Sequence, residues 1–563
     1  MNTSWLKACL TAVGTIVLTV GFLLYTTPVL AQVPNPPPTG GVVEETLPEP
    51  ERPLPEAQAP EVETPVPERA PAPDDGPTVM VQQFVISGNT LISDATLQAA
   101  LEPHLNYPQT LADLYAAADT ITALYRERGY GLAQTVLPAQ RVNSGIVRLE
   151  ILEGRIGKIV VRGNTDYDAD QLLAFASALQ PGQIYRTADM ERAILLLNDL
   201  PGLTARAVLQ PGAAYGTVDI TLEVTEDHWD FRASLDNHGR EELGKIRALM
   251  EADWHNSFHY GDEFSGALLY SEDGLLAYGS LAYSLPIGTD GGRLQFSVNK
   301  ADYEVAGAAF AFLGITGDNT NVRVDYSYPV IRSRDTNLIF VTGISHNQAE
   351  TLIFDAQIPL NETELNLLEV GLFWNRVFAG GSSLDLSTLL STNFKSIEDT
   401  EPGDPNGQQA KLTIDANWRV PFGRWSFITR ASAAYSPDPL VDTQKFSLGG
   451  PYSVRAYVPA EARGDKGLFV STELQRHFRL GSNNVLSVGA FVDAGTVERY
   501  PVAAGLGDLE DSLAGAGLSL TLTSNSWYHA SLSWATPIGN HKNTLDPTFE
   551  YEDQVWVQLS ASF

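Results

Sequence analysis

The chain has 563 residues, more than a single globular core normally organises, so we expect at least two architectures. Its 36 lysine and arginine residues stand against 68 aspartate and glutamate residues, and the net charge of -32 excludes the cationic surface by which proteins bind nucleic acid. The one cysteine, Cys9, lies in the first apolar run, so removal of that run would leave neither a disulfide nor a thiolate metal site.

Residues 1–31 have the order of a secretory signal peptide. Lys7 precedes an apolar stretch from Ala8 to Tyr25, and the small-residue ending Val29-Leu30-Ala31 comes before Gln32. We expect cleavage after Ala31. The alternative is a retained anchor, because the apolar stretch approaches the ~18–20 residues of a membrane-spanning helix. Since no later segment has such a run, the sequence predicts an exported protein without a further helical span.

Residues 32–76 are rich in proline and glutamate, as in "LPEPERPLPEAQAPEVETPVPERAPAP". Such a segment buries too little apolar surface to offset the entropy that ordering would cost. We therefore predict a stiff, acidic, disordered linker.

Two similar units follow the linker. The segments "FVISGNTLISDATLQAAL" and "IVVRGNTDYDADQLLAFA" share a strand, a Gly-Asn-Thr turn, an acidic helix cap and an amphipathic helix. Their glycines, Gly88 and Gly163, are 163 − 88 = 75 positions apart, which indicates an internal repeat. We place the two units at residues 77–154 and 155–226 and predict a β-α-α-β-β order for each.

The second helix of each unit is the best defined. In the first unit a helix should open at Thr110, with Asp113 completing a variant of the capping box, and end at Gly129. The strands that follow are predicted at Leu132–Leu137 and Ile146–Leu152. The corresponding elements of the second unit are a helix at Ala188–Leu200 and strands at Thr204–Leu209 and Thr217–Val224.

From residue 227 to 563 the pattern changes to period-2 alternation without helical stretches. In "NVRVDYSYPV" the residues Val322, Val324 and Tyr326 fall on one face, and Arg323 and Asp325 on the other. A soluble β-sandwich or propeller would also alternate. Very unequal loops, such as "SIEDTEPGDPNGQQ" beside "LPIGTDGGR", instead favour a transmembrane barrel with short turns at one rim and long loops at the other. We predict an all-β barrel of 16 antiparallel strands preceded by the two α+β units.

The chain ends on an aromatic residue in phase with an apolar stripe. In "VWVQLSASF" the alternate positions Val555, Val557, Leu559 and Ala561 lead to Phe563. A terminal aromatic in this position resembles the assembly signal of bacterial outer-membrane barrels, which implies the barrel-assembly machinery and outer-membrane lipid as partners.

As a whole, the sequence after the linker resembles the outer-membrane transporters of two-partner secretion, of the haemolysin and filamentous-haemagglutinin secretion/activation type. The segments that carry the resemblance are "VLPAQRVNSGIVRLEILEGRIGKI", "LNDLPGLTARAVLQPG", "YSLPIG" and "DYSYPVIRSRDTNL". The first two look like the ends of polypeptide-transport-associated (POTRA) domains, and the others like early barrel strands. The family shares a superfamily with the barrel-assembly insertase BamA.

The resemblance also assigns a role to an arginine in "LGGPYSVRAY". In the family a loop with a Val-Arg-Gly-Tyr/Phe motif folds back into the barrel, and a later strand carries Phe-x-Asp-x-Gly; the counterparts here are Val454-Arg455-Ala456-Tyr457 and Phe491 to Gly495. Arg455 is expected to pair with Asp493 and hold the loop in the lumen, an arrangement we call the latch. Bidentate guanidinium–carboxylate geometry is directional enough for this purpose.

Neighbouring residues are expected to support the latch. Tyr457 and Phe491 would shield or stack on the guanidinium, and Gly495 would leave room on the inner wall. Ala456 stands where the family has glycine. If that position requires a left-handed backbone, alanine costs about 1–2 kcal/mol there.

A second departure concerns the lumen. Many relatives place an N-terminal plug helix there, but "QVPNPPPTGG" after Ala31 contains prolines that lack the amide hydrogen a helix needs. We therefore expect no plug helix, and expect the barrel to bury none of residues 32–76.

The function that the resemblance implies is export of an unfolded adhesin-like or haemolysin-like partner from the periplasm through the barrel, with no cofactor. The POTRA domains, on the periplasmic side of a Gram-negative-type outer membrane, would bind the partner by strand addition. The candidate edge is the strand at Leu132–Leu137, with Leu132, Thr135, Val136 and Leu137 as binding residues.

Two alternatives remain. A BamA-like assembly role would use the same domains, although such relatives usually have more than two POTRA units. A barrel hydrolase would need a constellation around His238, His255 or His259, but no serine or carboxylate partner is fixed by spacing. We expect no enzymatic activity and no metal site.

Overall fold

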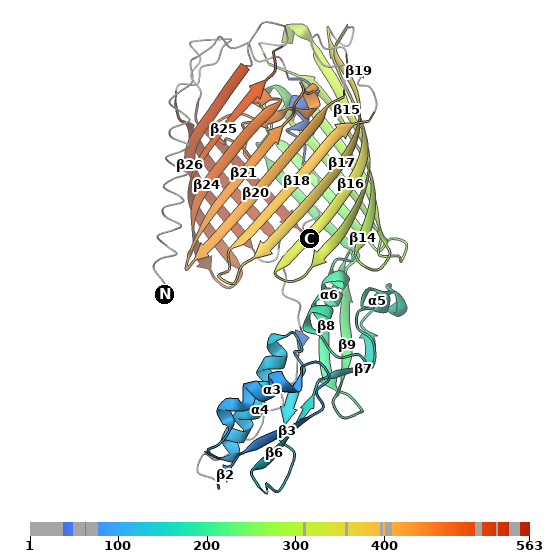
Figure 1. Cartoon of the computed structure of the whole chain (residues 1–563). Helices are drawn as coiled ribbons and strands as arrows, with labels where there is room; N and C mark the ends of the chain where they lie inside the picture. Colours follow the sequence, from blue (N-terminus) through green and yellow to red (C-terminus); the bar gives the residue numbers. More distant parts are fainter. Residues whose placement is uncertain are drawn as a thin grey trace.

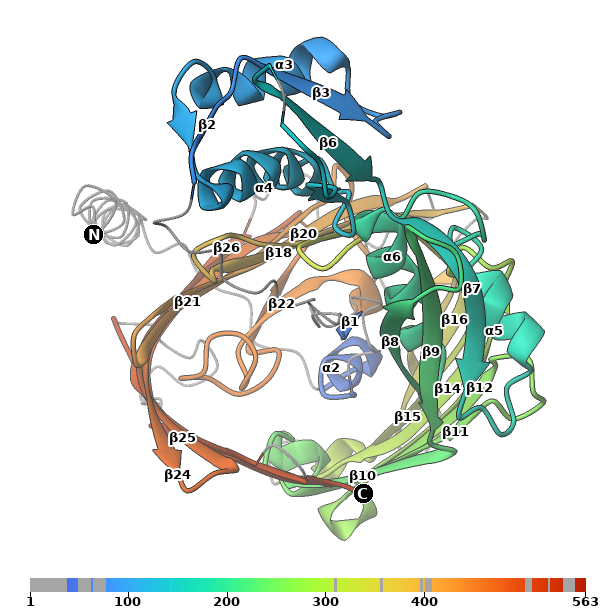
Figure 2. The ribbon, with the colours of Figure 1, turned by 90° about the horizontal axis from the view of Figure 1, so that it is seen from below.

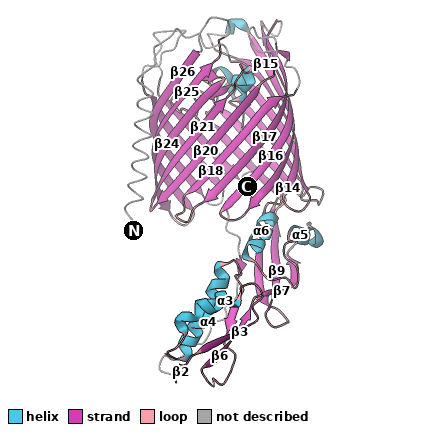
Figure 3. Cartoon of the chain, in the orientation of Figure 1, coloured by secondary structure: helices cyan, strands magenta, loops and turns pink. Residues whose placement is uncertain are grey.

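The computed structural model describes residues 38–48, 62–63, 77–142, 144–307, 311–354, 358–394, 398–399, 408–501, 509–524, 527–539 and 552–563. Two small α+β units lie beyond one end of a tall barrel (Figure 1). The helices gather in these units, whereas the barrel wall consists of strands (Figure 3). Within the described residues no helix combines the length and the apolar composition that crossing a bilayer requires. The predicted signal peptide lies outside the described residues.

The first unit packs two helices on a three-stranded sheet with the strand order β3-β6-β5. Helix α4 begins where the sequence predicts, because Thr110 and Asp113 form a capping box, and this prediction is confirmed. Its apolar face, including Ile121 and Tyr125, packs against Phe84 and Leu149 of the sheet. The elements of this unit are β2 (Val79–Met80), β3 (Gln83–Ser87), α3 (Asp94–Leu101), η1 (Glu102–His104), β4 (Pro108–Gln109), α4 (Leu111–Glu127), β5 (Gln134–Val136) and β6 (Ile146–Leu152).

The second unit has its own core around Met190, Ile194 and Leu222. Its sheet has the order β1-β8-β9-β7, in which β1 is a segment of the predicted linker that pairs in parallel with β8. The elements are β1 (Val62–Glu63), β7 (Arg155–Arg162), α5 (Ala169–Phe175), α6 (Thr187–Asn198), β8 (Leu203–Pro211) and β9 (Thr217–Glu226).

The Gly-Asn-Thr turns of the two units are built in the same way. Glu153 accepts bonds from the backbone and the hydroxyl of Thr90, and Glu226 does the same for Thr165. The glutamate of each unit thus ties the turn after its first strand to the end of its last strand. The repeat read from sequence is therefore a repeat of hydrogen bonding as well.

The barrel is a single closed antiparallel sheet, which confirms the predicted fold class. Seventeen named strands form it within the described residues, and the two-residue β19 continues β18 against β17, so the wall has 17 − 1 = 16 strands. The strands are β10 (Trp229–Asp236), β11 (Arg247–His255), β12 (Glu263–Ser271), β13 (Leu276–Ile287), β14 (Gly292–Val305), β15 (Ile315–Arg332), β16 (Thr336–Ile353), β17 (Ile358–Val377), β18 (Ser383–Asn393), β19 (Glu398–Asp399), β20 (Ala410–Phe422), β21 (Trp425–Tyr435), β24 (Lys466–Leu480), β25 (Asn484–Arg499), β26 (Leu509–Ser524), β27 (Tyr528–Pro537) and β28 (Gln554–Ser562).

Strand alternation places apolar side chains outside and polar side chains inside the wall. Leu268, Leu281 and Leu518 are exposed on the outer surface, whereas Asp493 and Asn337 are fully buried on the inner one. Pairing of β10 with β28 closes the barrel, and we call this junction the seam.

Two segments of the chain lie inside the barrel (Figure 2). One is the inward loop, residues 449–461, which connects β22 (Phe446–Leu448) with β23 (Ala462–Gly464). The other is α2 (Gly40–Glu44) with its flanks, residues 38–48, which we call the plug segment. The remaining short helices are η2 (Glu241–Leu243), η3 (Glu272–Gly274), η4 (Ala311–Leu313) and η5 (Asp442–Gln444).

The plug segment corrects two expectations. A helix does form in the predicted linker, and the barrel does bury part of residues 32–76: Val43 is fully buried among Leu269, Tyr303 and Ile315. The prolines do not prevent the helix because it begins after them, at Gly40. The short apolar pair Val42-Val43 gains the burial that the surrounding proline and glutamate residues cannot provide.

Candidate functional site

The inward loop has a compact tip that two glycines make possible. Gly449 and Gly450 have φ of 105° and 93°, and a Cβ on Gly449 would lie 2.1 Å from the carbonyl oxygen of Val458. The amide of Gly450 donates to the carbonyl of Tyr457 (2.8 Å), which closes the tip. The glycine pair therefore turns the chain so that Arg455 points at the wall.

Arg455 forms a bidentate ion pair with Asp493 on β25. Its Nε and Nη2 lie 2.8 and 2.9 Å from the two carboxylate oxygens, and its backbone N–H also donates to Asp493 (3.2 Å). The ring centroid of Phe491 is 3.2 Å from the guanidinium carbon. Arg455 is 5% exposed and Asp493 0%, so water screens this pair little. The structure thus brings together the arginine and aspartate expected to form the latch.

Glu473 of β24 is a second carboxylate partner that sequence reasoning missed. It accepts from Arg455 Nη1 (2.8 Å) and from Ser519 and Gln475. Its role can be recognised only once the strand register is known. Ser471 of β24 lies opposite Asp493 of β25, and Glu473, two residues further along β24, points to the same inner face. The guanidinium is therefore held from two neighbouring strands.

The residues around the arginine fill the space between loop and wall. Val454, Ala456 and Tyr457 are buried in one cluster with Phe491. A Cβ at Gly495 would lie 2.6 Å from the side chain of Leu448, so this glycine does leave room for the base of the loop. Phe491 supplies the ring contact with the guanidinium.

Ala456 does not have the backbone that its glycine counterpart suggested. It is absent from the residues with positive φ in the described chain, whereas Ala460 (φ 56°) is among them. Its methyl group instead packs against β26, where a Cβ on Gly515 would lie 2.4 Å from it. A glycine in the wall therefore accommodates the alanine in the loop.

The plug segment is bound to the base of the inward loop through Asp442. This carboxylate accepts from the hydroxyl of Thr39 (2.5 Å), the amide of Gly41 (3.1 Å) and Arg463 Nη1 (2.6 Å). Two wall residues also bind the plug: Asn319 donates to the carbonyl of Gly40 (2.8 Å), and Arg247 to that of Thr46. The helix is thus fixed by polar side-chain bonds at both ends.

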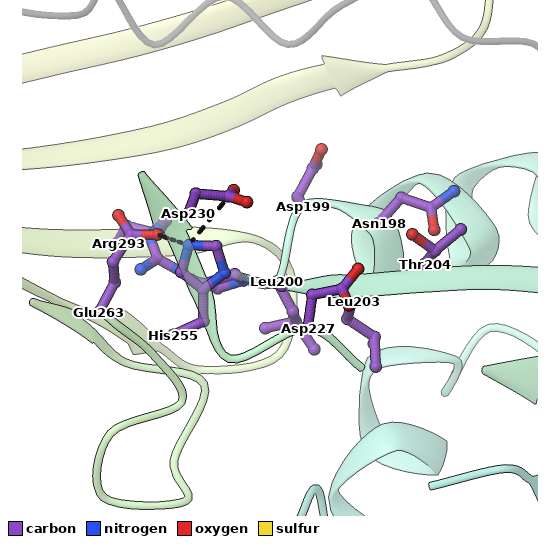
Figure 4. Close-up of a pocket in the computed structure, with 12 residues that line it drawn as sticks. Asn198, Asp199, Leu200, Leu203, Thr204, Asp227, Asp230, His255, Glu263 and Arg293 are labelled. Atoms are coloured by element: carbon purple, nitrogen blue, oxygen red, sulfur yellow. Dashed lines mark ion pairs between the residues drawn. The ribbon is translucent and has the colours of Figure 1, made fainter. Parts of the chain in front are cut away.

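A cleft of about 370 Å³ lies where the second α+β unit meets the barrel rim (Figure 4). Arg332 of β15 holds Asp199 at the end of α6 through two bonds of 2.9 and 2.8 Å. The imidazole of His255 lies 3.7 Å from both Asp230 and Glu263. The Arg332–Asp199 ion pair joins the two parts, whereas His255, Asp230 and Glu263 all belong to barrel strands. No set of three or more His, Cys, Asp or Glu side chains in the described structure is arranged to hold a metal ion.

The other two candidate histidines, His238 and His259, lie in a ring-packing contact and in a turn. His238 packs edge-on against Trp556 and Tyr452, with ring centroids 5.9 and 5.6 Å away. His259 occupies a turn with φ of 65°.

Phe563, at the end of the chain, exchanges two backbone hydrogen bonds with Phe231 of β10 and is 74% exposed.

The predicted binding edge in the first unit is shorter than expected. Only Gln134–Val136 forms a strand, so Leu132 and Leu137 lie outside it. Leu132 packs on the core of the second unit and Leu137 on that of the first. The amide of Thr135 donates to Thr122 Oγ1 of α4 (2.9 Å), which removes a donor from the edge. The strand is thus an edge strand, but a poorly available one.

Comparisons with known proteins were made with the whole chain. The model of the family "Haemolysin secretion/activation protein ShlB/FhaC/HecB" matches residues 215–522, and that of the ShlB-type POTRA domain matches residues 79–154. The heme/hemopexin transporter protein HuxB of Haemophilus influenzae is 24% identical over 86% of this chain and 87% of its own length. The hemolysin transporter protein ShlB of Serratia marcescens is 24% identical over 74% and 75%. The solved structure of CdiB from Escherichia coli has a TM-score of 0.69 at 23% identity, covering 88% of this chain and 93% of that one.

Proposed function

Because the chain belongs to the haemolysin secretion/activation family, it is an outer-membrane transporter of the two-partner secretion type, and we propose that it exports one unfolded partner protein through the lumen of its barrel. HuxB is a heme/hemopexin transporter and ShlB a hemolysin transporter, and we infer a large secreted protein as the cargo here. The two POTRA-type units would lie in the periplasm, on the side where the partner arrives.

The observation that carries the proposal is how the lumen is occupied. In the described structure, the plug segment and the inward loop are held inside by side chains such as Asp442 and Arg455. The wall is held by its own strand ladder, which these contacts do not form. Both segments can therefore leave the lumen while the barrel remains closed, which is what passage of a polypeptide requires.

We propose that the partner first binds a POTRA sheet edge. Backbone hydrogen bonds capture extended chains with little regard to their sequence. In this structure the edge of β8 already carries such a segment, since Val62 and Glu63 pair with Ala207 and Val208. This pairing favours β8 over β5, where Thr135 has lost its free amide, as the first binding edge.

The two alternative roles are less well supported. The family model that matches describes secretion and activation proteins, which favours export over a BamA-like assembly role. We also propose that the transporter carries out no catalysis and that Phe563 serves its own assembly by the barrel-assembly machinery.

The test is reconstitution of export. The chain is expressed in a Gram-negative host together with a candidate partner, chosen as a large secreted protein encoded beside it, and the candidate is assayed at the cell surface and in the medium. We expect export that depends on this chain, with loss in Arg455→Ala and no loss in Arg334→Ala, a matched exposed arginine at the barrel rim. Accumulation of other barrel proteins in the periplasm on deletion of the gene would instead favour the assembly role.

A further inference from the structure

The seam between β10 and β28 is incomplete, because β10 pairs with only part of β28. β28 pairs with β27 from Gln554 to Ala561, but β10 pairs only from Arg232 to Asp236 with Ser562 to Gln558. Within the described residues, no strand covers Gln554–Val557 on the β10 side. A strand edge without a partner leaves backbone groups that must be satisfied in another way.

One side chain bonds to the uncovered edge of β28, and a second side chain, on β28 itself, bonds to the inward loop. The amide of Asn237 donates to the carbonyl of Val555 (2.8 Å), its carbonyl oxygen accepts from the N–H of Val557 (2.7 Å), and its backbone N–H donates to Val557 (3.2 Å). From the lumen, the indole of Trp556 donates to the backbone carbonyl of Arg455 (2.7 Å). The tip of the inward loop is therefore attached to the closing strand of the barrel.

The same region has further contacts that cross from β10 to the loop. Arg240 donates to the carbonyl of Pro459 (2.7 Å), and the ring of His238 lies between those of Trp556 and Tyr452. Trp556 is 2% exposed, so water does not compete for its hydrogen bond. Loop, β28 and the end of β10 form one contact group.

We propose that Trp556 is a positioning residue for export: its indole holds the loop tip to β28, so that displacement of the loop and loosening of the seam occur together. The inference rests on the proposed function, because it assigns this coupling to the step at which the lumen opens. The loop would thus hold the upper part of β28, which no β10 pairing covers, while the pore is closed. That part of the seam would gain freedom when the partner displaces the loop, while the β10–β28 ladder keeps the barrel closed.

The test measures ion current through the purified full chain in planar lipid bilayers, with KCl as the only permeant. Trp556→Phe keeps the ring and removes the donor. Loss of one net hydrogen bond should raise the open fraction about fivefold. Trp534→Phe is the matched control, because this exposed tryptophan on neighbouring β27 donates its indole N–H to Asp553 on the outside (3.1 Å). A Trp556→Phe current equal to that of Trp534→Phe would overturn the positioning role.

Coupling to the seam is tested with a reversible lock. Ser234→Cys and Ser560→Cys, with Cys9→Ser, place thiols at directly opposed seam positions. Antiparallel strands bring such residues within disulfide distance. In the Trp556→Phe background, oxidation should return the open fraction to the wild-type value and reduction should restore the increase. If the oxidised and reduced forms conduct equally, the loop moves independently of the seam and the coupling is wrong.

These readouts need no partner protein, so they remain decisive if the export assay fails. Electrophoretic heat-modifiability shows that each variant has a folded barrel. Should Trp556→Phe not assemble, Asn237→Ala tests the same group from the β10 side, because it leaves Val555 and Val557 without their amide partner. It should also raise the open fraction, and a wild-type current would again contradict the proposal.

Discussion

At the scale of the residue, Arg455 carries a charge that two carboxylates share. Glu473 and Asp493 are both buried, and each has other donors: Ser519 and Gln475 bind Glu473, and the Arg455 backbone N–H binds Asp493. Removal of one member therefore leaves a different residual charge in each case. The arginine is the member whose loss leaves two buried carboxylates facing each other.

The first prediction is an asymmetric double-mutant cycle at the latch. Arg455→Ala should lower export by about tenfold or more, because it leaves two unmatched buried charges. Asp493→Ala should cost less, since Glu473 still pairs with the arginine. The double variant should be no worse than Arg455→Ala, because coupled residues give non-additive losses. Secreted partner is quantified against barrel content in the membrane, and additive losses would show that the residues act separately.

The second prediction concerns Ala456. Its backbone is not left-handed and its methyl group packs on Gly515, so Ala456→Gly should weaken the loop contact by about 1 kcal/mol through lost burial and added chain entropy. Gly515→Ala should be worse, because the new methyl group overlaps that of Ala456. The double variant Ala456→Gly with Gly515→Ala moves the methyl group from the loop to the wall. It should recover most of the lost contact energy. Open fraction in planar bilayers is the measurement, and a combined variant worse than either single one would disprove this packing.

At the scale of the element, each of the two α+β units is closed by one glutamate. Burial raises the pKa of Glu153, but hydrogen bonds from Thr90, Leu91 and Tyr125 outweigh it, so the pKa lies below its usual value. The pKa of Glu226 is lowered in the same way, by Thr165, Asp166 and Tyr167 against burial. A lowered folded-state pKa means that the bonds stabilise the fold fully above the unfolded pKa of about 4.5.

The third prediction is the pH dependence that follows. Residues 77–226 contain all the buried residues of both cores, without the packing of Val62, and should fold as a soluble fragment. Its free energy of unfolding should fall as the pH drops below about 4.5 towards the lowered folded-state values. Glu153→Gln and Glu226→Gln should each reduce stability at neutral pH and flatten this decline. Urea unfolding at several pH values measures the decline, with Glu150→Gln on β6, the strand that precedes Glu153, as a control. An unchanged slope in both variants would contradict the assignment.

The sequence predicts these elements where local chemistry determines them. The Thr110–Asp113 capping box and the alternating strand at Ile146–Leu152 appear at the predicted residues because each depends on neighbours within a few positions. The strand predicted at Leu132–Leu137 shrinks to Gln134–Val136, because tertiary packing draws both leucines into cores. The Arg455–Asp493 pair was accessible through a family motif. Glu473, Asp442 and Trp556 were not, since their roles depend on strand register and long-range contacts.

At the scale of the whole molecule, one carboxylate connects the plug segment and the loop that share the lumen. Asp442 binds Thr39 and Gly41 of the plug, and Arg463 at the far end of the loop. The fourth prediction is that Asp442→Asn raises the open fraction of the pore, because the plug loses its charged acceptor. Deletion of residues 38–48 should raise it further, and heat-modifiability of the wall should not change in either case.

The control for this prediction is Asp438→Asn, an exposed aspartate in the same loop region whose contacts with Ser436 are made by its backbone carbonyl and N–H. It should conduct like the wild type. If Asp438→Asn opens the pore as much as Asp442→Asn does, general loss of negative charge explains the result and the specific bond to the plug does not.

The pairing of Val62 and Glu63 with β8 also sets a limit on distance. The plug segment ends at Pro48, so 62 − 48 = 14 peptide steps join it to a fixed point on the second α+β unit. At no more than about 3.6 Å per residue, this connection cannot exceed ~50 Å. While β1 stays paired with β8, this short tether limits how far the plug segment can move towards the cell surface. A partner that replaces β1 on the edge of β8 releases residues 62–63 and makes the tether longer. The plug segment can then move farther before the tether is fully extended.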